Sequence, residues 1–444
     1  MRRPLLTTVQ AEKLYDAVRN LPLIDYHNHL SVFDIWENRR YSDLYELWIA
    51  TDPYKHRAMR ICGIDEKYIT GDADREDKFR AFCKIYPRLI GGALYDWCKI
   101  ELEDVLGIQT PILTENAGRI WDETKEKLQD DAFRARSILR RFGTEYIAPC
   151  AGTLDSLDEY VPELGVSPSL RGDDITHPDV NFLKSMEEKT GILITGLDSY
   201  IEAIRQRIDL FHAARCSFSD HAIDDGFLFT MSPEKAEAAF GRVMSGIAIN
   251  EEESMALMSY LLVRLADIYR HKGWTMQLHI GAMRKTSTRL RRVAGPAGGY
   301  AGIGNSISMQ SITSMLDAME QQSGSLPSII LYTLNPTRNA SFAVLTGSFT
   351  GVTQGPAWWW CDHVQGMREM LSTYAVYSVL DTFPGMTTDS RSLLSLSRHD
   401  YFRRTLCDFL GKNMQQGEMP DSMDCMSELA VHLCYTNAKA RIRA

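Results

Sequence analysis

The stretch LPLIDYHNHL at residues 21–30 changes abruptly from apolar to polar. Its first half is leucine and isoleucine, and His27 and His29 follow almost at once. Strands of parallel sheets are buried on both faces and therefore read as apolar runs without strict alternation. We therefore predict that this stretch is a buried parallel strand with two histidines at its carboxyl end.

The sequence on both sides of this strand has helical character. Residues 7–20 begin with threonines and place apolar residues at helical spacing, which predicts a first helix. Residues 31–140 form long amphipathic stretches rich in Trp, Tyr, Arg and Glu, with few strand candidates. We expect this block to be a helical insertion subdomain after the first strand, carried by a catalytic domain of residues 1–30 and 141–444.

Beyond residue 140, short apolar runs alternate with helical patterns. Strands are predicted within residues 144–150, 214–221, 274–282, 328–334 and 383–391. Helices are predicted over residues 199–214, 250–271, 308–322, 336–347, 364–380 and 399–412, with a polar run before Ala357. This alternation predicts an α/β protein with a parallel sheet, and about eight such units would close a (β/α)8 TIM-type barrel. An open doubly wound sheet is the alternative, although no G-x-G-x-x-G motif follows an early strand.

The composition excludes collagen-like and largely disordered proteins. Of the 444 residues, 44% are hydrophobic and 24% are charged, as is usual for a globular protein with a sizeable core. The formal net charge of −9 disfavours nucleic acid as a partner but allows a small anionic ligand. No apolar stretch reaches the roughly 18 residues of a membrane-spanning helix, and the N-terminus lacks a signal-peptide pattern. Nine scattered cysteines without C-x-x-C pairs indicate a reducing, cytoplasmic environment.

Side chains at the predicted strand ends could carry chemistry. His27 and His29 point to the same face of a strand, so both imidazoles could bind one divalent metal ion. His279 lies on the inward face of its strand, where it could also be an ordinary core histidine. Asp389 could complete a His-His-Asp metal site or act as a base toward a hydroxyl, with Arg391 on the same face.

Arginines and aromatic residues suggest a site for an anion. Arg171 and Arg398 could grip a carboxylate in a bidentate manner, although most single arginines lie on solvated helix faces. The tryptophan run at residues 358–360 could form the floor of a sugar pocket or belong to the core. Cys150 and Cys216 have no evident base beside them, which argues against a cysteine nucleophile.

These residues together resemble the uronate isomerases (glucuronate isomerases) of the amidohydrolase superfamily. The similar segments follow one another along almost the whole chain: LPLIDYHNHL, LYELW, DPYKHRAMR, YITGDA, ALYDW with KIEL, SDH at 219–221, MQLHIGAMR, LNPTRNA, the tryptophan run, TTDSRSLLS, RHDYFRR and YTNAKA. The resemblance implies a distorted (β/α)8 barrel with a helical insertion after the first strand. It also implies interconversion of an aldose uronate and its ketose, D-glucuronate with D-fructuronate or D-galacturonate with D-tagaturonate.

The resemblance further implies one divalent metal ion bound by His27, His29 and Asp389. Such a ligand set suits zinc, which we expect first, but also manganese or iron. Whether the metal takes part in the chemistry or organises the site stays open.

The resemblance assigns movement of the C2 proton to Tyr54. A tyrosine is a poor base near neutral pH unless a cation favours its ionised form, and we expect Arg391 or Lys55 to do so. Asp389 could instead take the hydroxyl proton that opens the sugar ring. His279 is expected near a metal-bound water. Substrate contacts are expected from Arg171, Arg398 and Trp359.

The chain departs from the family pattern at Asn28, Pro53, His56, Asp96, residues 152–156, Lys285 to Ser287, Trp360 and Cys361. Many of these positions lie in expected loops, so substrate preference is less determined than the fold. One alternative function is a metal-dependent amidohydrolase that uses metal-activated water on a small carboxylate substrate. Another is a barrel that binds a sugar acid without turnover.

Two observations favour the isomerase over these alternatives. Hydrolases usually need a second mid-barrel histidine, which the run at residues 328–336 lacks. A barrel without activity would lack part of the site, yet His27, His29, Asp389 and Tyr54 are all present. The expected partners are a small sugar acid and further copies of the chain in a homo-oligomer, with no nucleic acid and no membrane.

Overall fold

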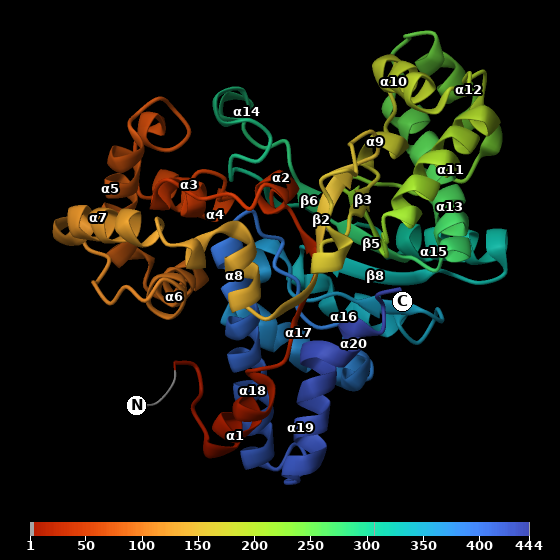
Figure 1. The fold of residues 1–444 in the computed structure, drawn as a ribbon. Coiled ribbons are helices and arrows are strands. Elements are labelled where there is room, and N and C mark those ends of the chain that lie inside the picture. The colour runs from red at the N-terminus through yellow and green to blue at the C-terminus, as the bar shows by residue number, and fades with distance from the viewer. Residues whose placement is uncertain (1–3, 306, 444) are drawn as a thin grey trace.

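The computed structural model describes residues 4–305 and 307–443 and has a parallel sheet at its centre (Figure 1). The sheet has seven strands in the order β1-β2-β3-β4-β5-β8-β9. They are Leu23–Asn28 (β1), Thr144–Gly152 (β2), Ser169–Arg171 (β3), Phe218–Ile223 (β4), Thr275–Ile280 (β5), Ser328–Thr333 (β8) and Val352–Gln354 (β9). Ala282–Met283 (β6) and Gly302–Ile303 (β7) form a separate antiparallel pair. Because neighbouring strands follow the chain order without a reversal, the doubly wound alternative is wrong.

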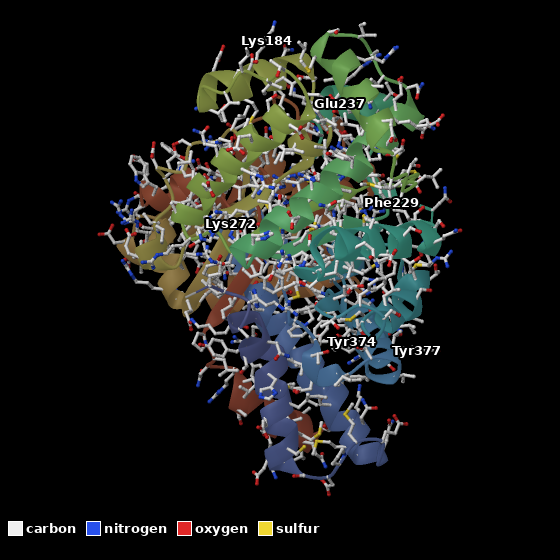
Figure 2. The ribbon with its side chains drawn as sticks, turned by 90° about the vertical axis from the view of Figure 1, so that its right-hand side faces the viewer. Lys184, Phe229, Glu237, Lys272, Tyr374 and Tyr377 are labelled. Carbon is white, nitrogen blue, oxygen red and sulfur yellow. The ribbon has the colours of Figure 1, made fainter. Side chains whose placement is uncertain are left out.

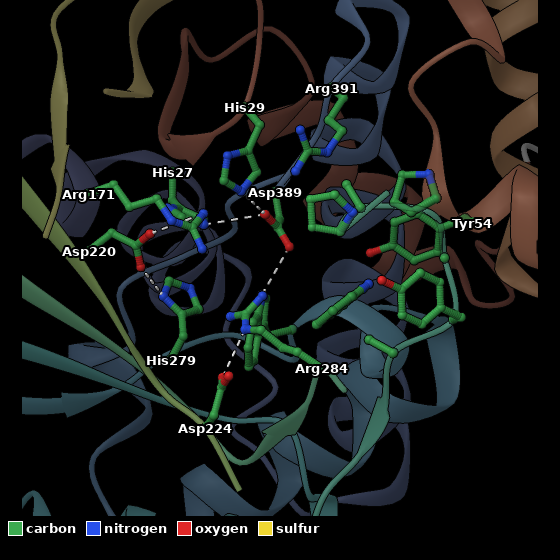
Figure 3. Close-up of a pocket in the computed structure, with 18 of the residues that line it drawn as sticks. His27, His29, Tyr54, Arg171, Asp220, Asp224, His279, Arg284, Asp389 and Arg391 are labelled. Atoms are coloured by element: carbon green, nitrogen blue, oxygen red, sulfur yellow. Dashed lines mark hydrogen bonds and ion pairs between the residues drawn. The ribbon is translucent and has the colours of Figure 1, made fainter. Parts of the chain in front are cut away.

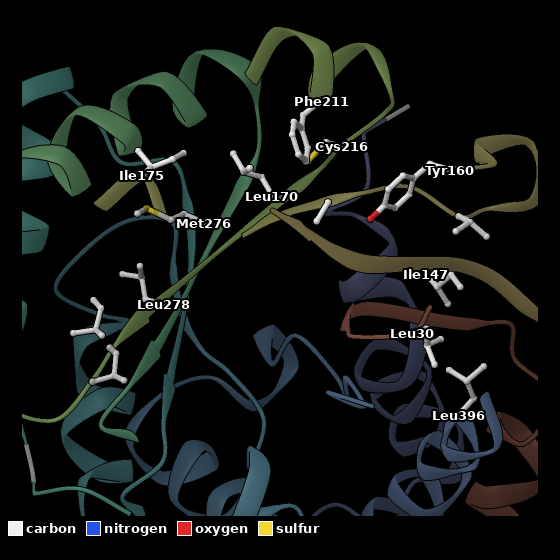
Figure 4. Packing of buried hydrophobic residues seen from close by; sticks show 14 of the residues in the cluster. Leu30, Ile147, Tyr160, Leu170, Ile175, Phe211, Cys216, Met276, Leu278 and Leu396 are labelled. Atoms are coloured by element: carbon white, nitrogen blue, oxygen red, sulfur yellow. The ribbon is translucent and has the colours of Figure 1, made fainter. Parts of the chain in front are cut away.

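The sheet curls around a polar interior. Gln277 of β5 donates from Nε2 to the Tyr26 carbonyl of β1 over 3.3 Å, although the two strands are not neighbours in the sheet. Met276 and Leu278 face the other way and pack in the main core with helix residues such as Phe211 (Figure 4). This alternation confirms that Gln277 and His279 share the inward face of the strand.

Helices pack around the sheet and contain far more of the chain than the strands do. Between β1 and β2, where every residue is described, the chain is helical without a strand: Val32–Trp36 (α2), Leu44–Trp48 (α3), Pro53–Ile61 (α4), Arg75–Ile85 (α5), Ala93–Ile100 (α6), Ala117–Lys127 (α7) and Ala135–Arg141 (α8). Trp48 and Phe79 of this block belong to the same hydrophobic core as Leu23 of β1. The block is therefore joined to the sheet by packing as well as by the chain.

The remaining helices follow the later strands. They are Asp173–Thr176 (α9), Val180–Thr190 (α10), Leu197–Ala213 (α11), Pro233–Met244 (α12), Glu251–Lys272 (α13), Thr288–Ala294 (α14), Met309–Ser323 (α15), Asn339–Leu345 (α16), Val364–Tyr377 (α17), Arg398–Gln416 (α18), Met423–Val431 (α19) and Asn437–Lys439 (α20). The first helix, Val9–Val18 (α1), packs against α18 and α19, near the end of the chain. Figure 2 shows the layer of α10 to α13 from outside, with Lys184 and Glu237 exposed to solvent. No helix in the described ranges combines the length and apolar character needed to cross a membrane.

Residues 383–391 were predicted to be a strand, and this prediction is wrong. The segment is irregular, although it lies beside β1: Asp389 N donates to His27 O over 3.1 Å, and His29 N donates to Ser390 O over 2.7 Å. Positive φ angles of 85° at Gly385 and 48° at Asp389 interrupt the extended backbone that a strand requires. The regular sheet therefore has seven strands where about eight βα units were expected.

Smaller differences concern short strands. The polar run before Ala357 contains β9. The strand expected at 214–221 begins only at Phe218, because a positive φ of 62° at Arg215 turns the chain after α11. The sequence also gave no sign of β3. Strands of three residues are too short to show a periodic pattern.

Asp25 attaches the irregular segment to β1. Its fully buried carboxylate accepts hydrogen bonds from Thr388 N (2.7 Å), Thr388 Oγ1 (2.7 Å) and Thr387 Oγ1 (3.0 Å). Asn28 Nδ2 donates to the same carboxylate over 3.0 Å, and His399 Nε2 lies 3.4 Å from it. A buried carboxylate in a protein needs partners of this kind, because its desolvation is otherwise very costly.

We predict that Asp25→Asn lowers the free energy of unfolding by about 3 kcal/mol, because several buried donors lose a charged acceptor. Chemical denaturation followed by circular dichroism measures the change. Asp421→Asn, at an exposed position, is the matched control and should leave stability within about 0.5 kcal/mol of the original chain. Equal stability of the two variants would contradict the role of Asp25.

Candidate active site

A cleft of about 450 Å³ opens at the carboxyl ends of the strands (Figure 3). Its size is within the range of small-molecule sites. It is lined by His27, His29, Pro53, Tyr54, Arg171, Asp220, Asp224, His279, Arg284, Lys285, Arg291, Pro296, Ala297, Gly299, Tyr300, Ala301, Trp358, Trp359, Asp389 and Arg391. The structure thus brings together all the residues predicted for the site except Arg398.

His27 and His29 lie on the same side at the end of β1 and both meet Asp389. Their Nε2 atoms are 3.4 Å and 3.1 Å from Asp389 Oδ1. Two ligands of one tetrahedral metal ion lie about 3.4 Å apart when the bonds are about 2.1 Å long. Burial raises the pKa of Asp389, but its bonds to the two histidines outweigh this and hold the pKa well below its usual range. These residues therefore fit a divalent metal ion.

Cys150, at the end of β2, extends this cluster. Its Sγ lies 3.6 Å from His27 Nδ1, and one potential ligand atom from each of Cys150, His27 and His29 lies within 4.8 Å of the others. Burial raises the pKa of the thiol, but the two histidines outweigh it and lower the pKa to about 7. The expectation that no base lies beside Cys150 is therefore wrong, because the fold places His27 next to it.

Asp220, within β4, orients His279. Its Oδ1 lies 2.5 Å from His279 Nδ1. Burial lowers the pKa of His279 to about 4, so the ring is neutral near pH 7. With the Nδ1 proton directed at Asp220, Nε2 keeps a free lone pair, and this atom has no hydrogen-bond partner in the described part of the chain. A buried acceptor without a partner can accept a hydrogen bond from a bound water or hydroxyl, or can itself coordinate a metal ion.

Cations surround the cleft and suit a negatively charged substrate. Arg171, at the end of β3, donates from Nε to Asp173 over 3.0 Å, and its Nη1 is 3.8 Å from Asp220. Arg284 donates to Asp224 over 2.8 Å and lies over the ring of Trp359. Arg391 follows Asp389 on the irregular segment and lines the cleft. Because Arg171 and Arg284 are already paired, they are held in fixed positions around the cleft.

Tyr54 enters the cleft from the start of α4. Asp52 caps this helix by accepting from Tyr54 N over 2.8 Å, and Pro53 suits the first helical position. The Tyr54 hydroxyl donates to Asp362 Oδ2 over 2.9 Å. Burial and the Asp362 carboxylate raise the pKa of Tyr54 well above its usual value, so the resting side chain is a neutral hydroxyl.

Two expectations about the cations near Tyr54 are corrected. Lys55 does not act on the hydroxyl, because its buried Nζ donates to Asp52 Oδ2 over 2.7 Å and lies near Glu101. Arg398 does not enter the cleft: it is 2% exposed and its guanidinium lies over the rings of Tyr54 and Trp97. Arg398 begins α18, whose packing behind the cleft could not be read from the sequence.

The tryptophan run lines one side of the site. Trp358 Nε1 donates to Asp389 Oδ2 over 3.0 Å, while Trp359 lines the cleft with a positive φ of 51°. The sequence interpretation missed Asp220 and Asp362. Asp220 could have been found by its place near the end of a predicted strand, as for His279, and Asp362 by its proximity to the tryptophan run.

Comparisons with known proteins find similarity along nearly the full length of the chain. A family model described as glucuronate isomerase matches residues 2–441. The uronate isomerase of Caldanaerobacter subterraneus subsp. tengcongensis is 38% identical and aligns over 98% of this chain and 97% of its own length.

Two solved structures are similar to the fold described above. The uronate isomerase of Thermotoga maritima superposes with a TM-score of 0.93 at 29% identity, covering 99% of this chain and 98% of that one. The glucuronate isomerase of Caulobacter crescentus superposes with a TM-score of 0.91 at 25% identity, covering 100% of this chain and 96% of that one. The match of the family model and the 38% identity over nearly the whole length decide the family. The chain belongs to the uronate isomerase (glucuronate isomerase) family of aldose–ketose isomerases, as its sequence predicted.

Proposed function

We propose that the cleft interconverts D-glucuronate and D-fructuronate or D-galacturonate and D-tagaturonate by moving a proton from C2 to C1 through an enediolate. The observation that supports this most is the meeting of Tyr54, Asp389 and Arg391 with the His27–His29 pair in one cleft. The enediolate oxygens gain negative charge, so donors and cations fixed around them lower the barrier.

The metal site is proposed to consist of His27, His29 and Asp389. Zinc is the first candidate and manganese or iron are alternatives. When bound, a divalent ion supplies a Lewis acid that polarises the substrate oxygens. The 3.1 Å and 3.4 Å separations of these ligand atoms support the set.

Five residues of the cleft have distinct proposed parts in the reaction. Arg171 binds the acidic substrate and Trp359 packs against the sugar, while Arg391 donates to an oxygen that becomes negative. Asp389 carries the negative charge needed to take a hydroxyl proton and open the sugar ring. Tyr54 moves the proton from C2 to C1, and its hydroxyl is protonated at rest because burial and the Asp362 carboxylate raise its pKa.

Three broader proposals accompany this mechanism. The helical block of residues 31–140 is a subdomain that contributes Tyr54 to the cleft of the barrel domain. The protein acts as a homo-oligomer. It works in the cytoplasm, where its cysteines stay reduced.

We predict that the purified protein, supplied with zinc or manganese, exchanges the C2 hydrogen of D-glucuronate or D-galacturonate in deuterated water and forms the ketose. Nuclear magnetic resonance follows both events. Absence of ketose formation from both substrates would overturn the proposed reaction. Exchange with a single one would identify the preferred uronate.

Asp389→Asn should reduce kcat at least about 1,000-fold, because the neutral amide can neither accept the hydroxyl proton nor supply a charged ligand. Steady-state kinetics and circular dichroism measure activity and folding of the same sample. Asp421→Asn, exposed and outside the cleft, should keep full activity. A folded Asp389→Asn protein with normal kcat would contradict the assignment.

Metal retention should depend on pH in a defined direction. Burial lowers the pKa of His27, but Cys150, Asp220 and Asp389 outweigh it and raise the pKa well above 6.5. Because a metal ion needs the neutral imidazole, protons compete with it, and bound metal should fall as the pH drops through and below neutrality.

Elemental analysis after dialysis at stepped pH values measures this loss. His27→Gln and His29→Gln should each weaken metal binding at least about 10-fold, whereas His271→Gln, at an exposed position, should not. Full metal content in the first two variants would exclude the proposed ligands.

A further inference from the structure

Asp362 is a buried carboxylate that lies behind Tyr54 and does not line the cleft. Asp362 follows Cys361, at the C-terminal end of the short helical turn Trp359–Cys361 that contains part of the tryptophan run. Its Oδ2 accepts the Tyr54 hydroxyl over 2.9 Å and lies 3.5 Å from Arg398 Nη1. A line of groups therefore leads from the cleft through the phenol to a carboxylate and then to a guanidinium.

Arg398 is held rigidly at the inner end of this line. Its Nη1 donates to Thr388 O over 3.1 Å, and its guanidinium carbon lies 4.0 Å and 4.6 Å from the ring centres of Trp97 and Tyr54. Because a guanidinium keeps its charge in proteins, Asp362 has a permanent positive neighbour. The same charge faces the Tyr54 ring and favours a phenolate there.

We propose that Asp362 is a positioning residue that takes the Tyr54 proton from behind, so that Tyr54 presents a phenolate oxygen to C2 of the substrate. This inference rests on the proposed function, in which Tyr54 handles the C2 proton. The Tyr54 O–H bond breaks and an O–H bond forms on Asp362. The phenolate then takes the proton from C2, and the electron pair of the C–H bond passes into the enediolate.

The second half of the reaction reverses these transfers. The Tyr54 hydroxyl gives its proton to C1, the proton of the C2 hydroxyl passes to O1 as the C2 carbonyl forms, and Asp362 returns the stored proton to the phenolate. No proton is gained or lost over the cycle, and neither an oxidant nor a reductant is needed. The pair thus works as one acid–base unit of which only the phenol reaches the substrate.

The charges around Asp362 are compatible with such a transfer. Burial raises its pKa to about 7, while Arg398 and the Tyr54 hydroxyl oppose the rise and Asp389 adds to it. The other titratable groups that interact with it are Tyr401 of α18 and its own neighbour Cys361. Once Asp362 holds the proton, the negative charge that helps to raise the Tyr54 pKa is removed. Proton transfer therefore makes the phenolate easier to form.

Asp362→Asn tests the inference, because the amide oxygen still accepts the Tyr54 hydrogen bond but takes up no proton. We expect kcat to fall about 100- to 1,000-fold with KM changed less than about threefold. The limb of the kcat–pH profile that falls toward acid, with an apparent pKa near 7, should disappear. In a Tyr54→Phe background the same substitution should cause no further loss, because Asp362 acts only through Tyr54.

The chain offers a matched control outside the cleft. The Tyr15 hydroxyl is hydrogen bonded to Asp400, and Arg404 Nη2 lies 2.6 Å from the same carboxylate, so the three residue types recur. Asp400→Asn should lower stability to some degree and leave kcat and its pH profile unchanged. This comparison separates loss of a carboxylate paired with a tyrosine and an arginine from loss of proton transfer.

Each result decides between the inference and its alternatives. A folded Asp362→Asn protein with normal kcat, or one whose pH profile keeps its acid limb, would overturn the role of Asp362 while the isomerase reaction stands. Additive losses of kcat in the variant that combines Tyr54→Phe with Asp362→Asn would also overturn the role of Asp362. If Asp362→Asn does not fold, Asp362→Glu decides, since it should retain the acid limb and kcat within about 10-fold. Absence of ketose formation by the unmodified protein would instead remove the proposed function itself.

Discussion

The buried carboxylate of Asp25 is the constraint on which the site depends. It joins β1 to residues 387 and 388, which lie more than 350 positions further along the chain. His27 and His29 are on one side of this junction, and Asp389 and Arg391 are on the other. The cluster of His27, His29 and Asp389 therefore depends on a junction between two parts of the chain that are far apart in sequence. The positive φ of 48° at Asp389 is a local strain that the junction maintains.

Paired charges explain how an acidic protein handles an acidic substrate. With a net charge of −9, the chain has no general attraction for a sugar acid. Inside the site, however, the carboxylates already have partners: Asp389 has two histidines, Asp220 has Arg171 and Asp362 has Arg398. Arg391 then remains to face the substrate with Arg171 beside it. Local pairing of the acidic groups, not the overall charge, makes the cleft suitable for an anion.

The sequence allowed much of the fold to be predicted where patterns were local. The apolar run before His27, the alternation through His279 and the long helices have strong periodicity, and the structure contains them. Residues 383–391 and β9 were misjudged because side-chain contacts and positive φ angles, not periodicity, shape them. Arg398 was misplaced for a similar reason: its motif resembles that of the family, but its direction depends on how α18 packs.

By itself, the sequence determined the α/β class, the family and the residue types of the site, because strand-end histidines, a late Asp-x-Arg and ordered family segments are properties of the chain. Only the tertiary structure decided which groups touch. It placed Cys150 beside His27, bonded Lys55 to Asp52 and set Asp362 between Tyr54 and Arg398. These contacts join residues that are mostly far apart in sequence, and their charges and pKa values follow from burial and distance, which no local pattern records.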